Sequence, residues 1–234
     1  MAGERRYEGK AKVMLTTESA DRLWMRFKDD ATALDGKKRA SITGKGALNT
    51  RITALLLGLV SAGGVPTHLR AQVDETTLEV DALEMMGIEV VLRNVLAGSL
   101  ARRLGRPEGQ VLPFPVVEFY LKDDALGDPM LAEDHVVALG LASVAEIAEV
   151  RRLTHRVNEI LEDALVAHGI TLVDFKLEFG RRNGQIVLGD EISPDTCRLW
   201  DTKTGEKMDK DRFRRDLGGL EEAYQEVLAR LERS

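Results

Sequence analysis

Alternating charged residues mark the segment 172–180, whose sequence is LVDFKLEFG. In a strand, Asp174, Lys176 and Glu178 share one face and the apolar residues share the other. A solvated outer face would explain this pattern, but the next strand-like segment can return as a hairpin and bring Asp190 near Glu178. Like charges on paired strands destabilise a sheet unless a divalent cation lies between them. The pattern therefore predicts that Glu178 and Asp190 bind magnesium together with nucleotide phosphates.

A short glycine–lysine run near the N-terminus is the second candidate. It consists of Gly9, Lys10, Ala11 and Lys12. Glycine lets the backbone approach a ligand closely, and two lysines two positions apart project from the same face of a strand. The run can hold a polyphosphate, although a solvated basic strand edge would have the same sequence. It is not a Walker motif, because the chain has no G-x-x-x-x-G-K-[ST] run.

Two later segments could recognise phosphate or carboxylate. A strand ends after Arg93, small residues follow, and a short helix is expected near Ser99, where free N–H groups would suit a phosphate monoester. An ordinary helix cap would have the same pattern. The polar loop 191–201 carries Arg198, and Arg214 follows it. Both arginines could bind an anion in a bidentate manner, or belong to an exposed loop and a basic helix face.

The histidines and the single cysteine offer no further catalytic group. The four histidines are scattered, without an HExxH run or a defensible Ser/His/Asp arrangement. We expect them to be structural or surface residues. Because Cys197 is the single cysteine, the chain can form no internal disulfide. No basic group that would activate Cys197 can be assigned, so we interpret it as an incidental thiol.

Hydrophobic periodicity predicts the elements that position these residues. Strands are expected over 10–16, 23–27, 68–73, 77–83, 89–93, 114–121, 170–178 and 185–190. Helices are expected over 47–60, 144–167 and 213–233, the last interrupted near Gly218 and Gly219. The segment 28–46 reads as a loop. The sum is an α+β chain with an antiparallel-sheet lobe over 1–86, an α/β lobe over 87–234 and a ligand cleft between them.

Composition bounds the function classes. The 234 residues carry a net charge of −6 with 5% aromatic residues, which disfavours a nucleic-acid-binding module. The N-terminus has no apolar signal segment, and the apolar stretch 52–65 is too short and interrupted to span a bilayer. A cytoplasmic location, with no membrane or nucleic-acid partner, is expected.

With these elements in hand, the chain closely resembles the SAICAR synthetase family over nearly its whole length. The motifs that carry the resemblance are 7–12 (YEGKAK), 29–30 (DD), 35–36 (DG), 93–99 (RNVLAGS), 119–124 (FYLKDD), 128–129 (DP), 172–180 (LVDFKLEFG), 189–194 (GDEISP), 198–201 (RLWD) and 207–214 (KMDKDRFR). The resemblance implies a two-lobed α+β fold similar to ATP-grasp and protein-kinase-like architectures, with ATP in the cleft. It also implies an ATP-dependent ligase of purine biosynthesis. This enzyme joins L-aspartate to the carboxylate of carboxyaminoimidazole ribonucleotide (CAIR) through an acyl phosphate, and it is expected to be a homodimer.

Resemblance and chemistry together assign roles. ATP is expected to bind Gly9, Lys10, Ala11, Lys12 and the backbone around Glu84 and Met85. Magnesium is expected on Glu178 and Asp190, and Lys122 is the candidate for the transferring phosphoryl group. Substrate binding is expected at Asp35, Gly36, Arg93, Ser99, Asp174, Lys176, Arg198 and Arg214.

Two departures from the family pattern and two rival functions stay open at this point. Gly87 stands where a proline is expected, and Thr196–Cys197 replaces a pair of small residues before Arg198. A kinase for a small molecule or lipid head group could use the same cleft without requiring aspartate. A non-catalytic nucleotide-binding regulator would bind ATP without consuming it.

Overall fold

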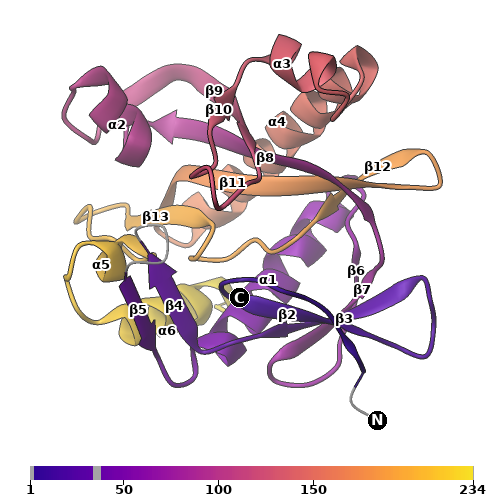
Figure 1. The fold of residues 1–234 in the computed structure, drawn as a ribbon. Coiled ribbons are helices and arrows are strands. Elements are labelled where there is room, and N and C mark those ends of the chain that lie inside the picture. Colours follow the sequence, from indigo (N-terminus) through magenta and orange to yellow (C-terminus); the bar gives the residue numbers. More distant parts are fainter. Residues whose placement is uncertain (1–2, 34–37, 234) are drawn as a thin grey trace.

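The computed structural model describes residues 3–33 and 38–233, which form two antiparallel sheets with helices packed around them (Figure 1). The first sheet has the strand order β1 (Arg5–Glu8), β2 (Lys12–Thr16), β3 (Arg22–Phe27), β7 (Thr77–Asp81) and β6 (Leu69–Gln72). The second has the order β10 (Met130–Leu131), β9 (Val111–Leu121), β8 (Glu84–Val95), β11 (Ile170–Arg182) and β12 (Gln185–Gly189), and β13 (Cys197–Asp201) also pairs with β11. A two-stranded hairpin contains β4 (Asp30–Ala33) and β5 (Lys38–Ser41). The helices are α1 (Lys45–Ala62), α2 (Gly98–Leu104), α3 (Glu133–Ala138), α4 (Val144–Ala167), α5 (Asp211–Arg214) and α6 (Leu220–Leu231).

The main core lies between the second sheet and the two long helices α1 and α4. In α4 the apolar residues recur at three- and four-residue spacing, as the sequence predicts, and from Ile147 to Leu165 most of them are buried, whereas Val144 at the start of the helix is exposed. Ser143 caps this helix by accepting the N–H of Glu146, so the capping box is confirmed. From α1, Ile52 and Leu56 enter the same core. A smaller core that includes Met25 and Leu78 underlies the first sheet.

Strand β11 is the centre of the second sheet and positions most of the candidate residues. Its apolar face, with Phe175, Leu177 and Phe179, is buried in the main core. The opposite face is not solvated, because Asp174 and Glu178 are each only 3% exposed. The solvated-face alternative is therefore wrong, and these carboxylates need partners inside the protein.

Several elements differ from the sequence expectation. The segment expected as a loop over 28–46 contains the hairpin of β4 and β5 and the start of α1. The strand expected over 89–93 is the middle of β8, so the expected lobe boundary after residue 86 falls inside that strand. The loop 191–201 ends in β13, a strand of five residues. These elements were missed because they are short, or because polar residues interrupt their pattern.

The glycine–lysine run also differs from the expectation. β2 begins at Lys12, so Gly9 to Ala11 form the turn between β1 and β2, closed by the Gly9 N–H donating to the Lys12 carbonyl at 2.9 Å. Lys10 and Lys12 therefore do not project from one face of a strand. Lys10 is exposed and contacts Asp124 at 2.8 Å, whereas Lys12 points into the protein.

Candidate active site

A cavity of about 1000 Å³ has walls from both sheets, including Met14 and Met25 of the first and Glu178 of the second. The predicted site residues that line it are Gly9, Lys10, Ala11, Lys12, Met85, Arg93, Ser99, Lys122, Asp174, Lys176, Glu178, Asp190, Arg198 and Arg214. Glu84 does not line it, and its exposed side chain lies 3.5 Å from Arg181. Asp35 and Gly36 lie outside the described residues.

Part of the wall is a group that we call the lysine–carboxylate cluster: Lys12, Lys122, Lys176, Glu89, Glu178, Asp190 and Glu191. Lys12 of the first sheet reaches Asp190 and, at 2.9 Å, Glu191, the two residues that directly follow β12 of the second sheet. The side chains of Asp190 and Glu191 are 12% and 3% exposed. This contact joins residues more than 170 positions apart, and no local pattern predicts it.

The remaining members of the cluster surround Glu178. One of its carboxylate oxygens accepts a hydrogen bond from Lys122, and the other contacts Lys176 at 3.0 Å. Lys176 also donates to Glu89, which faces Glu178 across the β8–β11 pair. Like charges on paired strands are therefore present, but in Glu89 and Glu178 of β8 and β11, which the sequence reasoning did not pair; across the predicted hairpin Glu178 is in register with Gly189. The Lys176 ammonium group contacts both carboxylates of the observed pair.

Electrostatics keep Asp190 and Lys12 of this cluster ionised. Burial alone raises the pKa of Asp190, but the charge of Lys12 and then of Lys176 holds that pKa below its usual range. Burial lowers the pKa of Lys12, but the carboxylates of Asp190 and Glu191 raise it further than burial lowers it. Both side chains thus carry full charges on the cavity wall at neutral pH.

The donor set of Glu178 and Asp190 fits a magnesium ion. Lysine ammonium groups contact the oxygens of both side chains: Lys12 contacts Asp190, and Lys122 and Lys176 contact Glu178. Both carboxylates thus already have positive charge beside them. Within residues 3–33 and 38–233, no group of three or more His, Cys, Asp or Glu side chains is placed to hold a metal. A two-carboxylate site leaves the other coordination positions to water and phosphate, as magnesium prefers.

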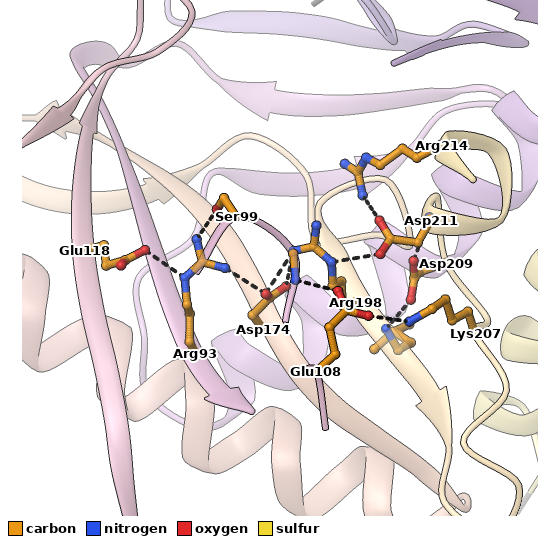
Figure 2. Close-up of polar contacts among 12 residues, drawn as sticks. Arg93, Ser99, Glu108, Glu118, Asp174, Arg198, Lys207, Asp209, Asp211 and Arg214 are labelled. Carbon is orange, nitrogen blue, oxygen red and sulfur yellow. Dashed lines mark hydrogen bonds and ion pairs between the residues drawn. The ribbon is translucent and has the colours of Figure 1, made fainter. Parts of the chain in front are cut away.

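A second group, of arginines and carboxylates, centres on Asp174 (Figure 2). Arg93 on β8 donates to Glu118 at 2.7 Å, to Asp174 at 2.9 Å and to the Ser99 hydroxyl at 2.9 Å. On the other side of Asp174, Arg198 on β13 donates to it at 2.9 Å. β11 lies between β8 and β13, and Asp174 is in register with both arginines.

Arg198 connects this group to α5. Its Nε donates to Asp211 at 3.1 Å, and Arg214 donates to the other oxygen of Asp211 at 2.7 Å (Figure 2). Arg93, Arg198 and Arg214 therefore each hold a carboxylate while lining the cavity. Fixed guanidinium groups of this kind suit phosphate or carboxylate binding.

At the start of α2 the backbone of Gly98 lies close to the Arg198 side chain. Gly98 has φ +55°, and a Cβ there would lie 2.4 Å from an Arg198 Nη atom. Glycine is required at this position for both reasons. The Gly98 N–H donates to Glu108 at 2.8 Å, so this N–H is not free for a phosphate, and the expectation of an open helix N-terminus is wrong for it.

The cavity also has an apolar wall, of which the sequence reasoning named only Met85. It is formed by Met14, Leu23, Met25, Leu83 and Met85. Leu83 packs against Gly180, where a Cβ would lie 2.7 Å from the Leu83 Cβ. Such a wall is suited to the flat face of a nucleobase.

Further residues of the site were missed or read as structural. Glu191 follows Asp190 directly, and its position beside a predicted ligand could have identified it. His68 is buried, as a structural histidine would be, and its Nε2 lies 2.9 Å from the Asp190 carbonyl oxygen. Burial lowers the pKa of His68 to about 4, so the ring is neutral. Burial raises the pKa of the Cys197 thiol, in agreement with an unreactive cysteine.

Comparison with known proteins gives a consistent result. The protein-family model described as SAICAR synthetase matches residues 5–231. A curated phosphoribosylaminoimidazole-succinocarboxamide synthase from Brevibacillus brevis is 55% identical over 229 residues, 97% of this chain and 96% of the relative. A solved SAICAR synthetase in complex with ADP is 51% identical with a TM-score of 0.94, covering 97% of each chain. The synthase of the same name from Ehrlichia chaffeensis is 39% identical with a TM-score of 0.96, covering 97% of this chain and 98% of that one.

Proposed function

Because this chain belongs to the SAICAR synthetase family and is an enzyme of that class, we propose that it joins L-aspartate to the carboxylate of CAIR. The reaction consumes ATP and passes through an acyl phosphate, giving SAICAR, ADP and phosphate. The observation that carries this proposal is that residues of the lysine–carboxylate cluster and of the arginine group line the same cavity.

The nucleotide is assigned to the side of the cavity that the first sheet forms. The apolar wall around Met25 and Met85 would hold the base, and the turn from Gly9 to Lys12 would cover the phosphates. A related SAICAR synthetase was solved in complex with ADP, which supports a nucleotide in this family's site. Glu84 stays in this assignment only through its backbone, since its side chain points to Arg181.

The ribonucleotide is assigned to the arginine group. Arg93, Ser99 and Arg198 present donors to a phosphate or carboxylate, and Asp174 fixes both guanidinium groups. Arg214 supplies a further cation from α5. Lys176 of the lysine–carboxylate cluster is two residues from Asp174 on β11, where it could contact the carboxylate that is to be activated.

The chemistry requires an activated carboxylate. An unmodified carboxylate does not form an amide at neutral pH, because oxide is a very poor leaving group. Transfer of the γ-phosphoryl group from ATP to a carboxylate oxygen gives an acyl phosphate, whose leaving group is phosphate instead of oxide. The aspartate amine then attacks the acyl carbon and displaces phosphate. Lys122, beside Glu178, would neutralise charge on the transferring group, and ligands that fill the cavity would exclude water from the intermediate.

Glu178 and Asp190 are the residues that would hold magnesium. When bound, the ion supplies charge neutralisation to the phosphate oxygens. The protein's own part is to orient both carboxylates. The lysines of the cluster do this in the ligand-free enzyme.

The test is a reconstitution with omissions. Purified protein is mixed with Mg-ATP, L-aspartate and CAIR, and each component is omitted in turn. We expect ADP and the succinocarboxamide only when all are present. ADP release that does not depend on aspartate would favour a kinase, and nucleotide binding without consumption would favour a regulator.

A further inference from the structure

A buried cluster lies beside the cavity where α1, α6 and the loop before β13 meet. Lys45 Nζ donates to Asp195 Oδ2 at 2.5 Å, and the Tyr224 hydroxyl donates to Asp195 Oδ1 at 2.5 Å. The side chains of Lys45 and Asp195 are 1% and 3% exposed. Both oxygens of Asp195 are therefore already engaged.

Lys210 lies next to this cluster and lines the cavity. Its side chain is only 10% exposed, and its Nζ is 3.6 Å from Asp195 Oδ2, beyond hydrogen-bond distance. Within residues 3–33 and 38–233, Nζ of Lys210 donates no hydrogen bond and has no other carboxylate within 4 Å. The backbone is held in place, since the Lys210 N–H donates to the Pro194 carbonyl at 3.0 Å.

The charges of this region do not balance. Two ammonium groups, of Lys45 and Lys210, share one carboxylate within 4 Å, that of Asp195, while Glu191 and Arg214 act on Lys210 with opposite signs from farther away. Tyr224 is neutral because burial and Asp195 raise its pKa. Lys45 is also the first residue of α1, where the positive end of the helix dipole disfavours a cation. Lys210 is therefore only partly compensated by Asp195, and burying such an ammonium group costs free energy. An anion arriving at Lys210 would remove that cost.

We propose that Lys210 binds a carboxylate of the amino-acid substrate, and that Lys45 and Tyr224 keep Lys210 available by occupying both oxygens of Asp195. This inference rests on the proposed function, which requires a dicarboxylic amino acid beside the ribonucleotide. Lys210 immediately precedes Asp211, which Arg198 and Arg214 contact, so an amino acid held there adjoins the ribonucleotide pocket.

The first experiment measures binding without turnover. Succinate, a dicarboxylate that lacks the amine, is titrated by calorimetry into wild-type enzyme and Lys210→Met in the presence of MgADP. We expect the variant to bind succinate at least about tenfold more weakly, the usual effect of losing a charged hydrogen bond. Lys207→Met is the matched control, because Lys207 is a nearby cation that stacks on Trp200 outside the cavity.

The second experiment is kinetic. For Lys210→Met the KM for aspartate should rise about tenfold or more, while the KM values for ATP and CAIR change less than about twofold. Lys210→Arg should restore part of the affinity. Tyr224→Phe frees an oxygen of Asp195 to pair with Lys210, so it should raise the KM for aspartate with little change in kcat.

The outcomes separate the two proposals. Equal succinate binding by wild type and Lys210→Met, or no succinate binding by wild type, overturns the role of Lys210. A fall in kcat with unchanged succinate binding also overturns it and indicates proton transfer instead. Succinate binding that depends on Lys210, in an enzyme that makes no succinocarboxamide, supports the carboxylate site and contradicts the proposed function. A larger effect on CAIR than on aspartate assigns Lys210 to the ribonucleotide and overturns the inference.

Discussion

Asp190 combines a left-handed backbone, with φ +60°, and a carboxylate that faces the cavity. Asparagine adopts this backbone region as readily as aspartate does. Asp190→Asn should therefore fold, while kcat falls at least about 100-fold because the charge is lost. Activity and thermal unfolding of the variant are compared with those of Glu149→Gln, which alters an exposed pair with Arg152. Near-normal turnover in Asp190→Asn would remove this residue from the metal site.

Arg198 is held by Asp174 and Asp211, and its loss leaves two buried carboxylates with fewer partners. Arg198→Ala should raise the KM for CAIR more than the KM for ATP, and it should also destabilise the fold. Arg198→Lys keeps the charge but not the fork of donors, so its effect should fall mainly on the KM for CAIR. Steady-state kinetics with each substrate varied check both variants. A larger effect on ATP would place the nucleotide, and not CAIR, at this arginine.

At the scale of single elements, two glycines make a matched pair. Gly98 begins α2 at φ +55° against Arg198, whereas Gly58 lies exposed inside α1 with nothing within 4 Å of its missing Cβ. Gly98→Ala should destabilise the protein by about 1–3 kcal/mol and displace Arg198. Gly58→Ala should stabilise it by about 0.5–1 kcal/mol. Denaturant unfolding measures both, and the same sign for both variants would contradict the close approach.

The elements that the sequence predicts well have a strong local pattern. Strand β11 alternates apolar and charged residues, α4 has a capping box and an apolar stripe, and both are confirmed. The hairpin of β11 and β12 is confirmed because its turn contains Asn183 and Gly184, both with positive φ. β13 has no such signal, since it is a strand only through its pairing with β11.

The residues of the candidate site also fall into those that a local sequence pattern predicts and those that it does not. Glu178 and Asp190 were predictable as cavity residues because the hairpin pairs Glu178 with Gly189, and Asp190 directly follows Gly189. The contact of Lys12 with Glu191 depends on how the two sheets pack, and the pairing of Lys45 with Asp195 depends on where α1 meets the loop before β13. Nothing in the local sequence encodes these distances.

At the scale of the whole molecule, one buried carboxylate should make stability depend on pH. Asp209 accepts the N–H of Leu199 at 2.9 Å and that of Asp211 at 2.7 Å. Burial, followed by the charge of Asp211, raises the pKa of Asp209 to about 7. The folded state therefore binds a proton that the unfolded state releases near pH 4, and the free energy of unfolding should fall as pH rises from about 4 to 7.

The Asp209→Asn variant tests this linkage. It should lose the contribution of Asp209, which is on the order of 1 kcal/mol for each pH unit in this window. Urea unfolding at pH 5, 6, 7 and 8 measures the difference between wild type and variant. Parallel curves for the two proteins would mean that Asp209 is ionised throughout.

The lysine–carboxylate cluster has a consequence for which form of the nucleotide can enter. Its three ammonium groups face four carboxylates, so the wall already has an excess of negative charge. A triphosphate that contacts these carboxylates directly places like charges at short range. A divalent ion travelling with it would offset part of that charge. At this cluster, though not over the whole cavity, whose lining also includes the cations Lys10, Arg198 and Arg214, we therefore expect charge balance to favour the metal-bound triphosphate.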